Sequence, residues 1–169
     1  MQIYVVRHGI AIDREDAKCP PEAERYLTEE GISKTRQVAR GVAELGVTAD
    51  LLLSSPYVRA MQTAEIFAGA LGYAKQKIRC TNLLLPGADA GLLFRELAKD
   101  KDSSGIFLFG HGPQVDDIVA LALGARNPCT ALKKAGVALV ELKRVSPPNG
   151  ELIWLAPPKL LRRAYKQDK

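Results

Sequence analysis

The sequence predicts an α/β three-layer sandwich, in which a mixed and mostly parallel sheet is flanked by helices. Two observations carry this prediction. Short apolar runs typical of buried strands alternate with stretches that have helix-start and helix-stop signals. The last two apolar runs are separated only by a turn-rich segment, so we expect them to pair as a hairpin. The length of 169 residues, with 47% hydrophobic residues, suits one domain over residues 1–169.

Two strand-helix units are predicted in the N-terminal half. Residues 2–6 form a short run that is β-branched or aromatic after Gln2, and this indicates a buried strand. A helix is expected after Thr28, a plausible N-cap. Residues 50–53 predict the next strand. The following helix is expected to have Ser55 as its N-cap and Pro56 at its first helical position.

The second half continues the same alternation. The predicted elements are a short strand at 77–81, a helix at 89–98 capped by Asp89, a strand at 106–109, a helix at 113–123, and strands at 137–142 and 152–155. The turn expected between the last two strands is Pro147-Pro148-Asn149-Gly150, because Asn-Gly is a hairpin signal.

The net charge of +5 is concentrated at the C-terminus. Residues 159–169 hold five basic side chains and one acidic side chain, which leaves 19 basic and 18 acidic residues in the rest of the chain. We expect a basic, solvated tail from about residue 159. Because basic and aromatic residues do not interleave through the body of the chain, we expect no nucleic-acid partner.

Other features indicate a cytoplasmic protein without a membrane anchor. No apolar run approaches the ~20 residues of a membrane span, and the first residues lack the pattern of a signal peptide. The three cysteines, Cys19, Cys80 and Cys129, are far apart and odd in number. They therefore predict reduced thiols rather than a disulfide framework or a zinc site.

The residues that suggest chemistry follow three predicted strands. Arg7 and His8 follow the first strand, Arg59 lies just after the strand at 50–53, and His111 follows the strand at 106–109. Ligands in open α/β sheets bind beyond the carboxyl ends of the strands, so these four side chains should converge. Two arginines and two histidines with no acid among them predict a site for an oxyanion such as a phosphoryl group.

Each fragment also has a purely structural explanation, since a histidine at a strand end can be an ordinary polar side chain and Arg59 a surface cation. A metal site is the chemical alternative. The arginines would repel a cation, and no further cluster of ligands accompanies the two histidines. We therefore expect no metal and no cofactor.

The motifs resemble those of the histidine phosphatase superfamily, which includes the cofactor-dependent phosphoglycerate mutases. They are Arg7-His8-Gly9, Ser55-Pro56-x-x-Arg59-Ala60-x-x-Thr63-Ala64 and Gly110-His111-Gly112. Leu27-Thr28-x-x-Gly31, Leu85-Pro86-Gly87 and the small size are more similar to the SixA-like phosphohistidine phosphatases. One departure is Gly112, where those sequences often have an acidic or amide residue.

The resemblance implies a phosphoglycerate mutase-like fold and assigns roles to the four residues. His8 would be transiently phosphorylated, while Arg7, Arg59 and His111 would bind the phosphoryl group. A neutral His8 imidazole would attack phosphorus in line, so its other ring nitrogen should donate to a nearby backbone carbonyl. The N-terminus of the helix after Pro56 could add its dipole to the phosphate site.

No general acid is obvious. Asp89 is a candidate, although a helix N-cap explains it as well, and Glu96 can equally be a solvated side chain. The acids in the loop after His8, namely Asp13, Glu15 and Asp16, are weaker candidates.

Three functions remain open. The first is a phosphatase acting on phosphohistidine in a phosphorylated protein, with a role in signal transduction. The second is a phosphatase or mutase acting on small phosphate esters. The third is a phosphate-binding module without catalysis, which would not need His8 as a nucleophile.

Overall fold

A computed structural model describes residues 1–100 and 102–165, and its centre is a six-stranded sheet with the order β3-β2-β4-β1-β5-β6. The strands are β1 (Gln2–Arg7), β2 (Leu51–Ser54), β3 (Arg79–Cys80), β4 (Gly105–Gly110), β5 (Val137–Arg144) and β6 (Asn149–Ala156). The first four are parallel, whereas β5 runs antiparallel to both β1 and β6. The predicted mixed, mostly parallel sheet is thus confirmed.

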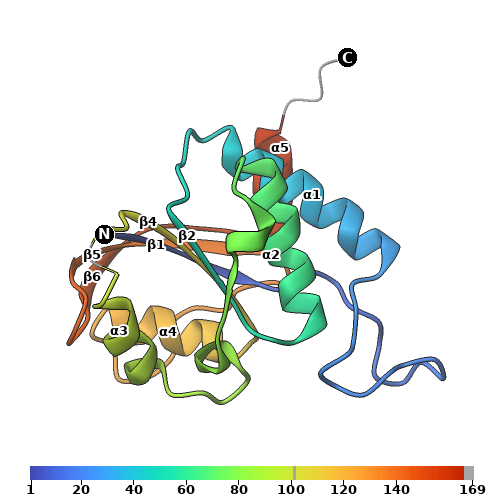
Figure 1. The fold of residues 1–169 in the computed structure, drawn as a ribbon, viewed down its shortest axis with the longest axis horizontal. Helices are drawn as coiled ribbons and strands as arrows, with labels where there is room; N and C mark the ends of the chain where they lie inside the picture. The colour runs from blue at the N-terminus through green and yellow to red at the C-terminus, as the bar shows by residue number, and fades with distance from the viewer. Residues whose placement is uncertain (101, 166–169) are drawn as a thin grey trace.

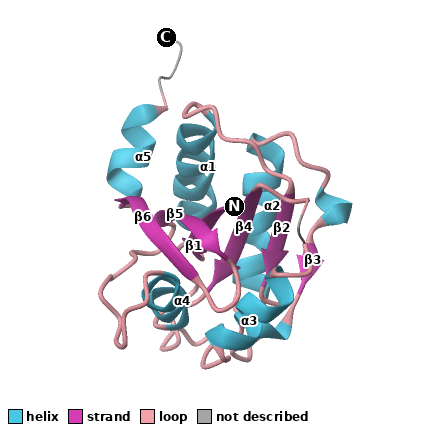
Figure 2. Cartoon of the chain, turned by 90° about the vertical axis from the view of Figure 1, so that its left-hand side faces the viewer, coloured by secondary structure: helices cyan, strands magenta, loops and turns pink. Residues whose placement is uncertain are grey.

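Helices cover both faces of the sheet and make three layers. The helices are α1 (Glu29–Ala43), α2 (Val58–Ala70), α3 (Ala90–Leu97), α4 (Gln114–Ala122) and α5 (Pro158–Ala164), with short 3-10 turns η1 (Lys75–Lys77) and η2 (Asn82–Leu84). Figure 1 shows α1, α2 and α5 above the sheet and α3 and α4 below it, and Figure 2 shows the same layers from the side. Within the described residues, no helix combines the length and the apolar character that crossing a membrane would need.

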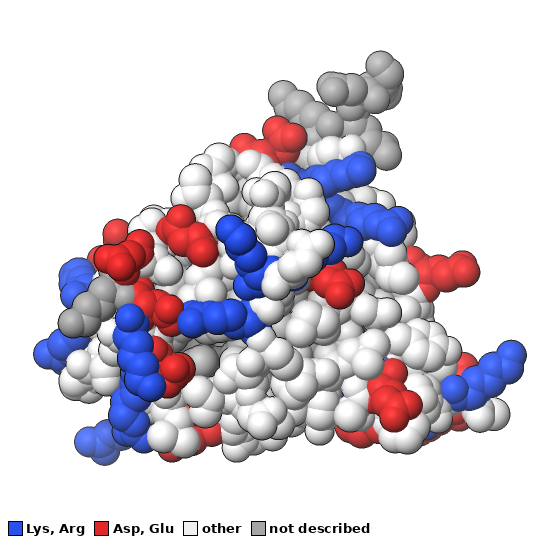
Figure 3. Space-filling model, viewed as in Figure 1, with Lys and Arg blue, Asp and Glu red and all other residues white. Residues whose placement is uncertain are grey.

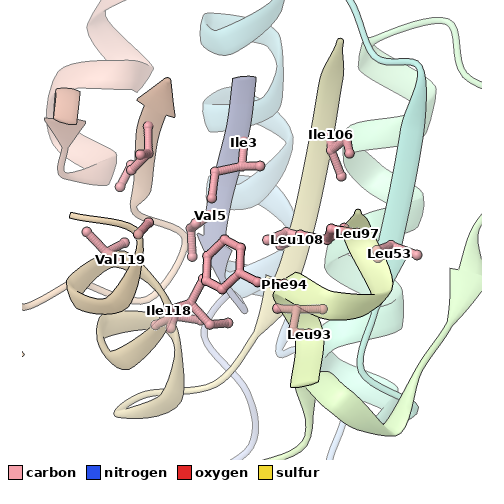
Figure 4. Packing of buried hydrophobic residues seen from close by; sticks show 14 of the residues in the cluster. Ile3, Val5, Leu53, Leu93, Phe94, Leu97, Ile106, Leu108, Ile118 and Val119 are labelled. Carbon is pink, nitrogen blue, oxygen red and sulfur yellow. The ribbon is translucent and has the colours of Figure 1, made fainter. Parts of the chain in front are cut away.

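Alternation along the strands produces one apolar core on each face. Ile3 and Val5 of β1 face α3 and α4, whereas Tyr4 and Val6 face the other layer. Figure 4 shows the first core, in which Phe94 of α3 lies against the side chains of the central strands. Because β1 and β4 are buried on both faces, their carboxyl ends are fixed in position.

Two of the three predicted helix caps are confirmed. The Thr28 side chain accepts a hydrogen bond from Gly31 N, and Asp89 accepts from Gly91 N and Leu92 N. The prediction for Ser55 is wrong. Helix α2 begins at Val58, and its N-cap, Tyr57, makes no side-chain capping bond. Ser55 points instead toward His111, which explains why a good capping residue does not cap here.

The C-terminal region of the structure differs from the sequence-based prediction in two places. The tight turn lies at residues 145–148, two residues earlier than predicted, and Asn149 and Gly150 already belong to β6. Residues 159–164 are not a solvated tail, because they belong to α5, which packs on α1 and buries Leu161. A Cβ at Gly41 would lie 1.9 Å from Leu161 O, so the glycine permits this close contact. The remaining tail residues, 166–169, lie outside the described part.

Candidate active site

The four candidate residues come together at the carboxyl ends of three parallel strands. Arg7 ends β1 and pairs in register with Gly110, the residue before His111. His8 N donates to Gly110 O at 3.0 Å, which holds the two strand ends together. Arg59 lies in the first turn of α2, the helix that follows β2. The sheet topology therefore brings the four side chains to one edge.

His8 is held in one ring orientation. Its Nδ1 lies 2.7 Å from Gly9 O, and because a carbonyl can only accept, Nδ1 carries the proton. The other nitrogen, Nε2, therefore has a free electron pair and accepts from Arg59 Nε at 3.2 Å. Burial, followed by the charges of Arg59, Arg7 and Lys134, lowers the pKa of His8 to about 4. The imidazole is neutral at neutral pH, the state that a nucleophile requires.

His111 lies beside His8, with 5.1 Å between the ring centroids. Its Nε2 is 2.8 Å from Ser55 Oγ, while its Nδ1 is buried and has no hydrogen-bond partner among the described residues. Burial, and then the charge of Arg59, lowers the pKa of His111 to about 3. His111 is thus a neutral imidazole with one nitrogen anchored and the other unengaged.

Arg7 is held at one end of its guanidinium group. Nη1 donates to Leu132 O at 2.8 Å, and the buried Nε has no partner within the described part of the chain. A Cβ at position 112 would lie only 3.0 Å from Arg7 Cζ. Gly112, which departs from the SixA-like pattern, therefore leaves room for this arginine against the backbone.

Unused donors at the site fit a bound oxyanion. Arg7 Nε is a buried, permanently charged donor without a partner, and His111 Nδ1 is the second unpartnered nitrogen. Buried polar atoms are normally hydrogen-bonded, so such exceptions need an explanation. A tetrahedral anion beside His8 would supply acceptors for both.

Two motif residues hold the chain just after His8 against helices α1 and α2. Thr63 of α2 accepts from Gly9 N at 3.1 Å and donates to Arg59 O at 2.7 Å, so it ties the loop to the arginine-bearing turn. A Cβ at Gly31 would lie 2.0 Å from Ile10 O, so this glycine lets α1 abut the chain just after His8.

A carboxylate that the sequence did not single out contacts the site. Glu22 Oε1 accepts from Arg59 Nη2 at 2.8 Å, and Glu22 O accepts from Arg59 Nη1 at 2.7 Å. Arg14 also forms two hydrogen bonds with this carboxylate, and Arg25 adds two more. The bonds from Arg14, followed by Arg25 and the charge of Arg59, lower the pKa of Glu22 to about 2. Glu22 is therefore an anion already bound to Arg59, one of the two candidate arginines.

The same loop covers the start of α2. Val58 N donates to Ala23 O and Arg59 N donates to Arg25 O, both near 3 Å. These backbone donors are therefore occupied by the loop rather than directed at the candidate site, contrary to the expected use of the helix dipole. Figure 1 shows this long blue loop, between β1 and α1, at the right-hand end of the sheet.

A second segment that covers the site, residues 125–135, is held by Asp116 of α4. Its Oδ1 accepts from Thr130 Oγ1 at 2.7 Å and from Leu132 N at 2.9 Å. Because Leu132 O in turn accepts from Arg7, Asp116 positions the arginine through this segment. Arg7, Gly112, Asp116 and this segment line a cavity of about 320 Å³ beside the site.

The candidate acids are engaged elsewhere. Asp89 caps α3, which is the structural alternative to a catalytic role. Glu96 pairs with Lys99 at 2.6 Å. In the loop between β1 and α1, Asp13 and Asp16 each accept from a backbone N–H two residues ahead, and Glu15 is exposed. None of the hydrogen bonds of these side chains reaches His8 or His111 among the described residues.

The residues that sequence analysis missed gave little signal. Glu22 is one of several acids in a polar loop, and neither its spacing nor its neighbours distinguish it. Asp116 stands out slightly, because it is an acid inside an otherwise apolar helix with the sequence QVDDIVALA. The feature that distinguishes Asp116 is visible only in the structure, where the residue is buried with 7% of its surface exposed.

Known proteins are similar to this chain in sequence and in fold. The family model of the histidine phosphatase superfamily (branch 1) matches residues 3–84, which carry Arg7, His8 and Arg59. An uncharacterized protein of Picosynechococcus sp. strain PCC 7002 is 36% identical over 141 residues, covering 81% of this chain and 82% of that protein. The mitochondrial serine/threonine-protein phosphatase Pgam5 of Drosophila persimilis is 26% identical, and the match covers 90% of this chain but 57% of Pgam5.

A solved structure of the protein histidine phosphatase SixA, complexed with tungstate, superposes with a TM-score of 0.84 at 28% identity, covering 95% of this chain and 99% of that one. The fold is thus the phosphoglycerate mutase-like fold of SixA. Together with the relative that shares 36% identity and the matched motif segment, this likeness establishes that the chain belongs to the histidine phosphatase superfamily.

Proposed function

We propose that this chain is a phosphatase that transfers a phosphoryl group to His8 and then hydrolyses it, with phosphohistidine in another protein as the substrate. The observation that carries the proposal is the state of His8. Its Nδ1 proton is held by Gly9 O, so the electron pair of Nε2 faces the side chain of Arg59. A pure binding module would need the arginines but not a nucleophile held in this tautomer.

The reaction follows from these positions. His8 Nε2 attacks phosphorus in line, and the new N–P bond forms as the bond between phosphorus and the leaving group breaks. Arg59 Nε, which donates to His8 in the resting site, then donates to a phosphoryl oxygen, and Arg7 Nε donates to another. Attack by water on phosphorus restores His8 and releases phosphate.

His111 contributes a neutral donor in this scheme. If Ser55 Oγ donates its proton to His111 Nε2, the single proton of the neutral ring resides on Nδ1, the unpartnered nitrogen. Ser55 Oγ also accepts from Tyr57 N at 3.3 Å, which orients the hydroxyl for this role. Nδ1 would then donate to a phosphoryl oxygen without adding a positive charge that repels the arginines.

Within residues 1–100 and 102–165, no candidate acid hydrogen-bonds to His8 or His111, and this favours phosphohistidine as the substrate. An alkoxide leaving group needs a proton, whereas an imidazole whose other nitrogen is protonated departs as a neutral base. Asp89 is occupied as a helix cap, so it is a weaker general acid than its place in the sequence suggested. The likeness to a structure of the protein histidine phosphatase SixA supports the same substrate class.

Small phosphate esters are the alternative substrates, because the fold is also that of a phosphoserine phosphatase from Entamoeba histolytica, at 16% identity and a TM-score of 0.70. The deciding experiment compares kcat/KM for a phosphohistidine peptide with kcat/KM for 3-phosphoglycerate and glucose 6-phosphate. We expect the peptide to be preferred, and Asp89→Asn to behave like the control Glu96→Gln on the same helix. Efficient hydrolysis of either ester that is lost only in Asp89→Asn would contradict the proposal.

Metal independence is part of the proposal. The four candidate residues are arginines and histidines, and Glu22, the carboxylate that contacts them, is already paired with Arg59, so a cation would lie beside two permanent positive charges. Incubation with EDTA followed by assay should leave kcat unchanged. Strong inhibition that added Zn²⁺ or Mg²⁺ reverses would restore the metal hypothesis.

A further inference from the structure

A basic cavity of about 310 Å³ lies between α1, the segment before β5, and α5. Its charged lining is entirely basic, and the five side chains are Lys34, Lys133, Lys134, Lys159 and Arg162. Over the face drawn in Figure 3, acidic and basic side chains are interspersed, which makes a cavity lined by one sign of charge distinctive. A lining of this kind attracts anions.

Most of this positive charge is not neutralised. Lys34 pairs with Glu30 one turn earlier in α1. The other four cations have no ion-pair partner in residues 1–100 and 102–165, and Arg162 Nε donates only to the neutral amide oxygen of Gln37, at 3.0 Å. An incoming carboxylate or phosphate would therefore not have to displace an internal carboxylate from them.

The cavity adjoins the active site. Ile10, which lines it, is two residues after His8, and Ala135, which also lines it, donates its N–H to both Arg7 O and His8 O at 3.0 Å. Lys133 lines both this cavity and the one beside Arg7. A molecule that fills the active site and extends past Lys133 would therefore enter the basic cavity.

The rest of the lining favours a protein side chain over a free inorganic anion. Ile10, Ala135, Pro157 and Pro158 supply apolar surface, which suits the methylene groups of a glutamate more than a fully hydrated ion.

We propose that this basic cavity docks acidic side chains of the phosphorylated partner protein, next to its phosphohistidine. The proposal rests on the function proposed above, since it names the kind of protein surface that presents the phosphohistidine. Charged contacts of this kind select partners and raise association rates more than they tighten binding.

The test uses two synthetic phosphohistidine peptides that differ only in flanking residues, four glutamates in one and four glutamines in the other. The wild-type protein should show about tenfold higher kcat/KM for the acidic peptide at low ionic strength, and added salt should shrink this preference. The variant Lys34→Glu with Lys159→Glu should lose the preference, because both lysines line the cavity and neither contacts the catalytic residues.

The matched control is Lys75→Glu with Lys77→Glu in η1. This segment precedes β3, so it lies at the amino ends of the parallel strands, opposite the active site, and the change in net charge is the same. The control should keep the preference, and both double variants should hydrolyse p-nitrophenyl phosphate at the wild-type rate. Equal hydrolysis of the two peptides by the wild type, or a preference that survives in Lys34→Glu with Lys159→Glu, would overturn docking.

Two further outcomes would also overturn it. Equal losses of p-nitrophenyl phosphate and peptide turnover in the cavity variant would show that the cavity serves the reacting centre. Sulfate that stabilises the wild type but not the cavity variant, at constant ionic strength and with no peptide preference, would identify a free-anion site. Turnover of p-nitrophenyl phosphate with hydrolysis of neither peptide would instead refute the proposed function, and this inference with it.

Discussion

The strand ends and the two segments that cover them contribute to the site in different ways. At the strand ends, Arg7, His8 and His111 are fixed by a sheet that is buried on both faces. The covering segments, residues 11–27 and 125–135, contact the two arginines. Glu22 accepts from Arg59 through its backbone carbonyl and its carboxylate, and Leu132 O accepts from Arg7. In the proposed function the strand ends supply the nucleophile, and the covering segments hold the arginines in place.

The largest effects should come from His8 at a strand end and from Arg59 in the first turn of α2. His8→Ala should reduce turnover to background, and Arg59→Ala should lower kcat by about 10²–10³-fold, as loss of an oxyanion donor does. Arg25→Ala is the matched control in the covering loop. Arg25 contacts Glu22 and Ile12 O but no reacting group, so about tenfold or less is expected. Steady-state kinetics on p-nitrophenyl phosphate, with thermal unfolding to verify the fold, measure this. Equal losses for the two arginines would remove the distinction between the regions.

Ser55→Ala should have an intermediate effect, because the hydroxyl positions His111 without contacting substrate. Loss of one hydrogen bond of about 1 kcal/mol corresponds to a fall of roughly five- to tenfold in kcat. The imidazole ¹⁵N spectrum should change for His111 and not for His8, and Ser55→Thr should restore both readouts. A kcat loss without any change in the His111 signals would contradict a positioning role.

The two imidazoles should stay neutral well below the pH at which exposed histidine titrates. The pKa values of about 4 for His8 and about 3 for His111 mean that neither should take up a proton from about pH 8 to about pH 5. With only two histidines in the chain, ¹⁵N NMR can follow both. Between about pH 6.5 and about pH 4 the unfolded chain binds more protons, so the free energy of unfolding should decrease as pH falls. Titration of either ring near pH 6.5 would contradict the burial that the structure gives them.

The smallest effect should come from Glu22→Gln, and it has the opposite sign. If Arg59 binds the phosphoryl group as proposed, the Glu22 carboxylate competes with that group for Arg59 Nη2, so removing its charge should strengthen binding of an oxyanion. Vanadate should inhibit the variant at several-fold lower concentration, on the scale of about 1 kcal/mol for a partly exposed ion pair. Weaker inhibition would show that Glu22 holds Arg59 in place rather than competing for it.

Sequence reasoning predicted the strand ends far better than the covering segments. A buried strand followed by Arg-His-Gly is a local pattern, and the parallel sheet makes several such patterns meet, which explains why the positions of Arg7, His8 and His111 were predictable. Ser55 shows where local patterns fail, because its capping propensity was real but His111 took its hydroxyl. Glu22 and Arg25 act through contacts between loops, for which no periodicity exists. Helix α5 was missed because its basic residues obscured the apolar pair Leu160 and Leu161.

The central claim is that the phosphoryl group is transferred covalently to His8 Nε2. The direct measurement is rapid quenching of the protein into alkali during turnover of a radiolabelled aryl phosphate, followed by mass spectrometry of the digest. Phosphohistidine is stable in alkali and labile in acid, so the intermediate should survive this quench. We expect the radiolabelled phosphoryl group on Nε2 of His8 and no label in the His8→Ala variant. Label on a serine, threonine or aspartate, or undiminished turnover by His8→Ala, would contradict it.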